Sequence, residues 1–178
     1  HALVINHSHL GHKIEAVLGD GRQFGARIAY SPEPGGGLET AGGIFRALPL
    51  IDTDPFVVVN GDIWTDFQFA RLPRTLTGLA HLVLIPNPAH HPGGDFHLSN
   101  GAVKPHGPRM LTFSGIGVYR RALFAGCQPG KFPLAPLLRA AMERNAVSGE
   151  CHEGRWMDVG TPERLAALDQ ELRAKATP

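Results

Sequence analysis

Four consecutive apolar residues, Phe56-Val57-Val58-Val59, constrain the fold of this chain more than any other segment. A strand with one solvated face alternates apolar and polar side chains, whereas a strand with no polar position is typical of a sheet covered on both faces. Helices packed on the two faces of a sheet give that environment. The run therefore predicts a central strand in an α/β fold.

The first half of the chain alternates in character, which supports this prediction. Apolar runs and helical spacings follow one another between clusters of Gly, Pro, Asn and Asp. The pattern predicts strands at 2–5, 26–30, 56–59 and 80–85, and helices at 10–18, 40–48 and 67–72. This order predicts a Rossmann-like three-layer α/β sandwich with a mixed, mostly parallel central sheet.

The second half adds elements of another kind. Asn100-Gly101 lies between two short strand-like runs, which is a hairpin signal. Thr161-Pro162 has the N-cap and first-turn residues of a final helix. Between them we expect a long strand at 111–119, a helix at 134–142 and a strand pair formed by 147–151 and 155–159. With no visible linker, residues 1–178 are expected to form one domain with antiparallel additions to the sheet.

Composition excludes several classes of function. Lys and Arg number 17 against 16 Asp and Glu, so the net charge of +1 gives no basic field for nucleic acid. No apolar run is long enough for a membrane span, and no signal peptide is visible. The two cysteines, Cys127 and Cys151, form neither a disulfide framework nor a Cys-x-x-Cys pair. We therefore expect a cytoplasmic protein.

Asp62 is the first candidate site residue. Ligands of open α/β sheets bind beyond the carboxyl ends of the strands, and Asp62 comes shortly after the strand 56–59. A carboxylate there can hold a hard cation such as Mg²⁺, and Asn60 can contact a sugar hydroxyl. Gly61 allows the backbone to approach a ligand closely. The alternative is an ordinary turn, because Asn, Gly and Asp are also common turn residues.

Asp158 is the second candidate, in Trp156-Met157-Asp158-Val159-Gly160. It also lies at the end of a predicted strand, just before a capped helix. Two converging carboxylates, completed by phosphate oxygens, make a plausible magnesium site. Locally, a polar residue in a strand-to-helix turn explains Asp158 equally well.

The glycine-rich segment 35–43 is the third candidate. Gly42 and Gly43 at the start of a helix can let a base or a phosphate approach backbone N–H groups. Glu39 or Thr40 can bind the edge of a base. The segment is neither a Walker loop nor a Gly-x-Gly-x-x-Gly fingerprint, and a flexible loop is the alternative.

Asp95 and the neighbouring pair His90-His91 are weaker candidates. Asp95 can accept hydrogen bonds from a sugar, although an Asp at this place often only begins a hairpin. Adjacent histidines rarely bind one metal ion together, so His90 and His91 are interpreted as residues of a solvated loop.

Taken together, these blocks resemble the sugar-1-phosphate nucleotidyltransferases. The resemblance extends over nearly the whole chain and includes Leu38-Glu39-Thr40, Asn60-Gly61-Asp62, Gly94-Asp95-Phe96, Phe113-Ser114-Gly115 and Met157-Asp158-Val159-Gly160. It is strongest with members that use UTP and N-acetylmuramic acid 1-phosphate in cell-wall recycling, so it implies a nucleoside triphosphate and a sugar 1-phosphate as substrates.

The resemblance also implies a role for each matching residue. Asp62 and Asp158 are similar to the magnesium ligands of the family. The sugar phosphate would be contacted by Asn60, Asp95 and Gly115. The base would be held by Glu39, Thr40 and Gly42.

The chain departs from the family in two respects. It has no Gly-rich loop with Arg and Lys for the triphosphate, so we expect the strand, loop and first helix that carry it to precede His1. It also lacks an acidic residue near Phe132 that glucose- and thymidylyl-specific relatives have, which argues against those substrates. Mannose-1-phosphate guanylyltransferase activity and a non-catalytic nucleotide-sugar-binding domain remain open alternatives.

Overall fold

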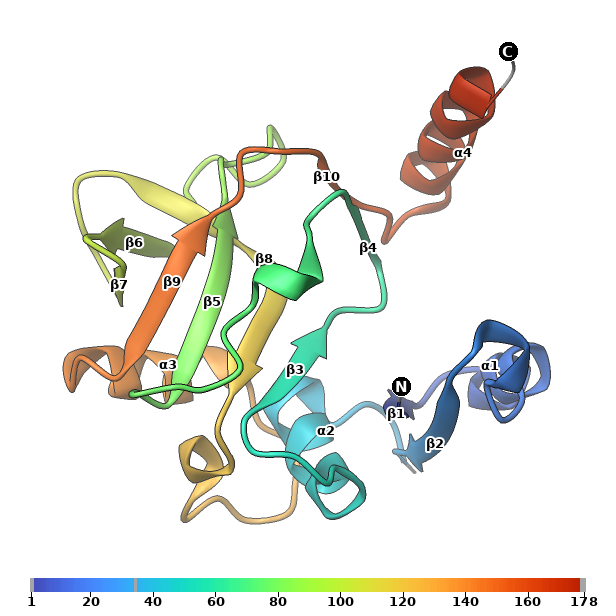
Figure 1. The fold of residues 1–178 in the computed structure, drawn as a ribbon, viewed down its shortest axis with the longest axis horizontal. Coiled ribbons are helices and arrows are strands. Elements are labelled where there is room, and N and C mark those ends of the chain that lie inside the picture. The colour runs from blue at the N-terminus through green and yellow to red at the C-terminus, as the bar shows by residue number, and fades with distance from the viewer. Residues whose placement is uncertain (1, 34, 177–178) are drawn as a thin grey trace.

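The computed structural model describes residues 2–33 and 35–176 (Figure 1). It therefore leaves residues 1, 34, 177 and 178 of the predicted 1–178 domain outside the description. The strands are β1 (Ala2–His7), β2 (Arg27–Pro32), β3 (Phe56–Val59), β4 (Ile63–Thr65), β5 (Ala80–Ile85), β6 (Phe96–Ser99), β7 (Ala102–Lys104), β8 (Met110–Tyr119), β9 (Val147–Cys151) and β10 (Trp156–Asp158). The α-helices are α1 (Gly11–Leu18), α2 (Glu39–Ala47), α3 (Leu134–Glu143) and α4 (Pro162–Ala176).

The main sheet has six strands in the order β3-β8-β5-β9-β7-β6, and β6 also pairs with β8. Strands β5 and β9 are parallel, whereas β8 runs antiparallel to both β3 and β5. The α/β class and the mixed sheet are therefore confirmed. Fewer strand pairs are parallel than predicted, because hydrophobic periodicity indicates burial and carries no information on strand direction.

The apolar run Phe56–Val59 forms β3 as predicted, but β3 lies at one end of the described sheet and is not central. Phe56 is buried, whereas the exposed fractions of Val57 and Val59 are 51% and 43%. The strands buried on both faces are instead β5 and β8. In β5, Leu82 and Leu84 enter one hydrophobic cluster and Val83 enters the other.

Different layers cover the two faces of the sheet. On one face, α2 and α3 contribute Ile44, Leu138 and Met142 to the larger core, where burial raises the pKa of the Tyr119 phenol well above its usual range. On the other face, Phe67 and Leu72 cover Val83, Ile116 and Val118. The helix predicted at 67–72 is wrong: the segment contains only the 3-10 turn Phe69–Arg71, so an irregular segment covers this face.

Strand pairing in the second half is partly as predicted. The hairpin β6–β7 is confirmed, with positive φ at both Asn100 and Gly101. The predicted pairing of 147–151 with 155–159 is wrong. Strand β9 pairs with β5 and β7, while β10 pairs with β4. Strand β4 has only three residues, too few for its sequence to show the alternation that indicates a strand.

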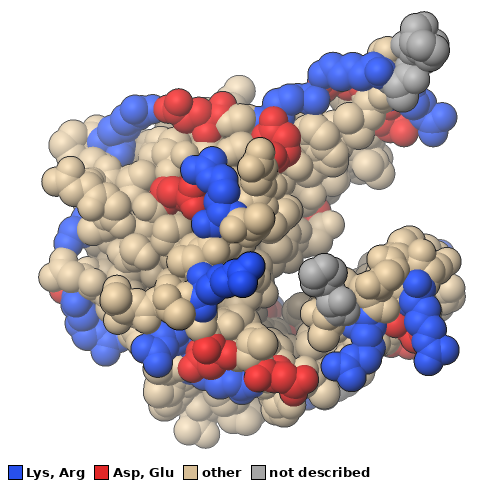
Figure 2. Space-filling view, viewed as in Figure 1, with Lys and Arg blue, Asp and Glu red and all other residues tan. Residues whose placement is uncertain are grey.

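A second, parallel sheet contains β1 and β2 alone. Helix α2 packs against both of these strands and also against α3, so it joins the small sheet to the main body. In the described part of the chain, β1 forms a ladder only with β2, and β3 only with β8. Figure 2 shows a notch between the lobe of α1, β1 and β2 and the rest of the molecule.

The last helix, α4, begins after Thr161, whose Oγ1 accepts a hydrogen bond from the Arg164 backbone N–H at 3.3 Å. This is the predicted cap, because a Thr side chain satisfies a free N–H of the first turn. Figure 1 shows α4 extending away from the sheet. Among the described residues, every helix falls short of the length or apolarity needed to span a membrane.

Candidate functional site

The two predicted acids, Asp62 and Asp158, are brought together by a small antiparallel ribbon made of β4 and β10. Asp158 lies opposite Ile63 in the ladder, and the Val159 N–H donates to the Asp62 carbonyl at 2.8 Å. A methyl group placed on Gly160 would lie 2.9 Å from Asp158 Oδ1 and 3.4 Å from Asp62 Oδ2. The carboxylates of this acid pair (Asp62 and Asp158) therefore approach one point from two distant parts of the sequence.

The two acids differ in how they are held. Asp158 Oδ1 accepts the Gly160 N–H at 2.7 Å, and its Oδ2 accepts Arg164 Nη1 at 2.7 Å. Asp62 is exposed, and no hydrogen bond or ion pair reaches its carboxylate from the described residues. Asp158 is thus held in place by the protein, while both oxygens of Asp62 remain open to a ligand.

Asn60 and Gly115 form a second contact of the site. The Asn60 N–H donates to the Gly115 carbonyl at 2.9 Å, which continues the β3–β8 ladder by one bond. Gly115 has a φ of +81°, and a Cβ there would lie 2.8 Å from Asn60 Nδ2. Only glycine accommodates this conformation together with an Asn side chain pressed against it.

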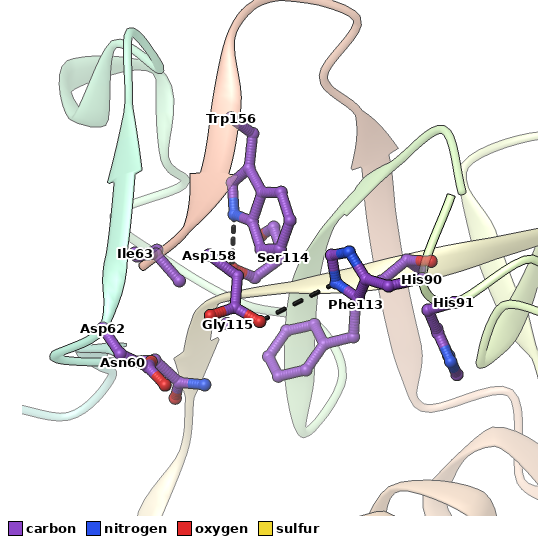
Figure 3. A pocket seen from close by; sticks show the side chains of 11 residues that line it. Asn60, Asp62, Ile63, His90, His91, Phe113, Ser114, Gly115, Trp156 and Asp158 are labelled. Atoms are coloured by element: carbon purple, nitrogen blue, oxygen red, sulfur yellow. Dashed lines mark hydrogen bonds and ion pairs between the residues drawn. The ribbon is translucent and has the colours of Figure 1, made fainter. Parts of the chain in front are cut away.

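A cavity of about 280 Å³ connects these residues, as Figure 3 shows in close-up. The Trp156 indole N–H donates to the Ser114 carbonyl at 2.9 Å and ties the ribbon to β8 beside the cavity. The lining residues are Asn60, Asp62, Ile63, His90, His91, Thr112, Phe113, Ser114, Gly115, Trp156 and Asp158. Four of the predicted site residues (Asn60, Asp62, Gly115 and Asp158) therefore share one cavity.

Asp95 lies beside this cavity but does not line it. Its Oδ2 accepts the Phe113 N–H at 2.8 Å, and its Oδ1 lies 3.1 Å from His91 Nε2. Both oxygens thus have partners within the protein. The direct sugar contact predicted for Asp95 stays a prediction, and the contact with His91 gives Asp95 a structural role as well.

The predicted base-binding residues, Glu39, Thr40 and Gly42, begin α2 and do not line the cavity. The Gly42 N–H already donates to the Phe132 carbonyl at 3.1 Å, and a Cβ on Gly42 would lie 2.3 Å from the Gly130 carbonyl oxygen. Gly42 therefore allows two parts of the chain to approach closely. A contact between these three residues and a base stays a prediction.

Glu33 was not among the predicted residues, although its side chain holds the loop before α2 in place. Its carboxylate is buried and accepts hydrogen bonds from Asn6 Nδ2 at 2.8 Å and from the Leu38 N–H at 2.7 Å. It leaves no room for a larger residue at Gly43, where a Cβ would lie 2.5 Å from Glu33 Oε1. A single Glu in a Pro- and Gly-rich segment gives no sequence signal for this role.

Three more residues of the site were not predicted. Arg164 reaches Asp158 from the first turn of α4. His90 and His91 lie on a loop and are about half exposed, in agreement with the interpretation above, and they also line the cavity. The sequence does not show which way the loop after the predicted strand 80–85 folds, so it gives no signal that its two histidines reach the cavity.

The acid pair offers carboxylate oxygens, the type of ligand that hard cations prefer. Among the residues that the structure describes, no group of three or more His, Cys, Asp or Glu is arranged to hold a metal ion. A cation at the acid pair would therefore need further oxygen ligands from water or from a phosphate, as Mg²⁺ sites that bind phosphorylated substrates commonly have.

Comparison with known proteins identifies the family. The chain is 52% identical to the N-acetylmuramate alpha-1-phosphate uridylyltransferase of Neisseria meningitidis, over 92% of this chain and 74% of that protein. It is 29% identical to the protein of the same name from Caulobacter vibrioides, over 95% of this chain and 76% of that protein. No protein-family model matches the chain.

A solved structure agrees at the level of the fold. The inositol-1-phosphate CTP transferase of T. maritima superposes with a TM-score of 0.73 at 15% identity, over 98% of this chain and 76% of that chain. The similarity to the Neisseria protein is high enough, and covers enough of both chains, to assign the family. The chain therefore belongs to the sugar-1-phosphate nucleotidyltransferases and is an enzyme of that class.

Proposed function

We propose that this enzyme transfers a uridylyl group from UTP to N-acetylmuramic acid 1-phosphate, releasing pyrophosphate. The observation that carries the proposal is the acid pair beside a cavity of about 280 Å³. Two relatives whose names state this activity support the choice of base and sugar. The sugar would come from cell-wall turnover, and the cytoplasmic location expected from the sequence stays a prediction.

In the proposed reaction, an oxygen of the sugar phosphate attacks the α-phosphorus of UTP. A P–O bond forms there, and the bond to the β-phosphate oxygen breaks as pyrophosphate leaves. Two anions must meet, so alignment and neutralisation of charge supply most of the acceleration. The protein needs no nucleophile of its own.

The proposal assigns each contact of the site a task. Asp62 and Asp158 would hold Mg²⁺, whose chemistry is to neutralise phosphate oxygens and align them. The donor set fits, because both residues present carboxylate oxygens toward one point. Asn60 would donate to the sugar phosphate, and the open backbone at Gly115 would let the sugar lie against β8. Trp156 fixes the ribbon so that the acids keep their separation.

A substrate panel tests this proposal in the complete polypeptide that carries these residues. UTP, GTP and dTTP are each combined with the 1-phosphates of N-acetylmuramic acid, N-acetylglucosamine, mannose and glucose, and pyrophosphate release is measured. We expect the highest kcat/KM for UTP with N-acetylmuramic acid 1-phosphate. A preference for GTP with mannose 1-phosphate would instead favour guanylyltransferase activity, and absence of turnover with every pair would contradict the proposal.

Arg164→Ala is expected to lower kcat/KM roughly tenfold, because it removes a charge-assisted hydrogen bond that fixes Asp158. The side chains of Arg164 and Asp158 are 35% and 26% exposed, so solvent screens the pair and stability should change little. Arg173→Ala on the same helix removes a surface pair with Asp169 and serves as the control. Equal kcat/KM values for the two variants would show that Arg164 does not position Asp158.

A further inference from the structure

His90 and His91 stand next to each other on the turn between β5 and β6, and both line the cavity. Their side chains are 50% and 43% exposed. The reaction proposed above gives neither of them a task. They are also the only side chains on the described lining that can carry a positive charge, since no Lys or Arg is among the lining residues.

The turn that carries them, residues 86–95, is held rigidly by one side chain. Asn87 Nδ2 donates to the carbonyls of Pro92 at 2.9 Å and Met110 at 3.2 Å, and Asn87 Oδ1 accepts from Thr112 Oγ1 at 2.9 Å. A backbone hydrogen bond from His91 N–H to the Pro88 carbonyl, at 2.9 Å, closes the turn. A surface loop with only a connecting role does not need this degree of order.

Close packing fixes the end of the same turn. Gly94 has a φ of +62°, and a Cβ there would lie 2.7 Å from Asn87 Oδ1. The turn therefore holds its backbone shape before a substrate arrives, which keeps both histidines at the cavity wall.

The two rings face different parts of the site. His90 Nε2 lies 3.7 Å from Asp158 Oδ2, and Figure 3 shows His90 extending toward the acid pair, with His91 farther from it. His91 Nε2 lies 3.1 Å from Asp95 Oδ1, while the Phe113 N–H holds the other oxygen of Asp95 at 2.8 Å. Asp95 thus fixes His91 at the side of the cavity away from Asp62.

This arrangement suits a sugar with two acidic groups at different positions of its ring. The phosphate of a sugar 1-phosphate would lie at the acid pair, where a bound cation would offset the negative charges. A carboxylate elsewhere on the same sugar would be repelled by the acid pair and needs N–H donors in another part of the cavity. Imidazole N–H groups are suitable donors; because His91 Nε2 is already bonded to Asp95, the donor left for such a carboxylate is the Nδ1–H of a ring protonated on both nitrogens.

We propose that the turn 86–95 recognises the carboxylate of the lactyl ether of N-acetylmuramic acid 1-phosphate, with His91 as the main donor. His90 forms the wall between that carboxylate and the phosphate. The inference rests on the proposed function, because it explains how that substrate is distinguished from the otherwise identical N-acetylglucosamine 1-phosphate. In this proposal the turn selects the sugar, and the acid pair holds the cation used in the reaction.

The experiment compares these two sugar phosphates, which differ only in the lactyl ether, in the complete polypeptide with UTP. His91→Gln should lower kcat/KM for N-acetylmuramic acid 1-phosphate about tenfold, the usual effect of losing a charge-assisted hydrogen bond. The kcat/KM for N-acetylglucosamine 1-phosphate should fall much less, so that the ratio of the two kcat/KM values drops severalfold. His90→Gln should have a smaller effect in the same direction.

His106→Gln is the matched control, because His106 is exposed, lies on the loop between β7 and β8 and does not line the cavity. Thermal midpoints establish that all variants are folded. If His91→Gln lowers kcat/KM for both sugars equally, or leaves the ratio between them unchanged, the inference is overturned while the proposed function stands. If the unmodified protein uses other sugar phosphates but not the muramic one, the proposed function itself is refuted, and this inference with it.

Discussion

Asp62→Asn is expected to reduce turnover by about 100- to 1,000-fold, because an amide of the same shape lacks the negative charge with which Asp62 would hold Mg²⁺. The Asp62 side chain is exposed and its carboxylate has no partner among the described residues, so its loss should leave the fold intact. Pyrophosphate release gives the activity, and the thermal midpoint reports stability. Asp158→Asn should cause a loss of similar size, because the two carboxylates approach the same point.

Asp52→Asn is the matched control for this prediction. Asp52 is also exposed and is neither part of the cavity lining nor bonded to a described residue. The same change of charge there should leave turnover within about twofold, since an isolated surface charge is screened by solvent and salt. A tenfold or smaller loss in Asp62→Asn, with the fold preserved, would remove Asp62 from the proposed magnesium site.

Gly115→Ala is expected to damage stability and activity together. A Cβ at φ +81° costs roughly 1–2 kcal/mol of backbone strain. It would also meet Asn60 Nδ2 at 2.8 Å and force that side chain away from the cavity. We expect kcat/KM to fall at least tenfold and the free energy of unfolding to fall by more than the strain alone.

Gly126→Ala separates the effect of backbone strain from the effect of displacing Asn60. Gly126 has nearly the same φ, +83°, but no atom lies within 4 Å of the added methyl group. Denaturant unfolding of this control should show the backbone strain alone, with normal turnover. If Gly115→Ala and Gly126→Ala proved equally stable and equally active, the contact between Asn60 and Gly115 would have no importance for the site.

The sequence predicted the acid pair better than its surroundings. Asp62 and Asp158 were identifiable because each lies at or just beyond the end of a predicted strand, which is a local pattern. Their convergence depends on β4, whose three residues, Ile63–Thr65, are too few to show a period. The pairing of β4 with β10 is a long-range contact, and local periodicity does not encode it.

The contrast between local sequence pattern and long-range contact also explains the other differences between the predicted and the observed structure. The run Phe56–Val59 indicated a buried strand, but burial does not determine position in the sheet, and β3 lies at one end. The segment 67–72 was predicted as a helix, yet it is mostly irregular and its Phe67 and Leu72 pack on β5 and β8. His90 and His91 were interpreted from their adjacency alone. Their place at the cavity depends on Asn87, whose hydrogen bonds with Met110 and Thr112 join segments distant in sequence.

Helix α2 connects the two parts of the molecule that carry the proposed site residues. The acid pair is carried by a ribbon tied to the six-stranded sheet, whereas Glu39 and Thr40 begin a helix that also packs on the separate β1–β2 sheet. In the described residues, no ladder of hydrogen bonds joins the two sheets. Gly42 and Gly43 allow α2 to pack closely against Gly130 and Glu33. In this part of the chain, α2 therefore connects the end that would read the base with the end that would hold the phosphates.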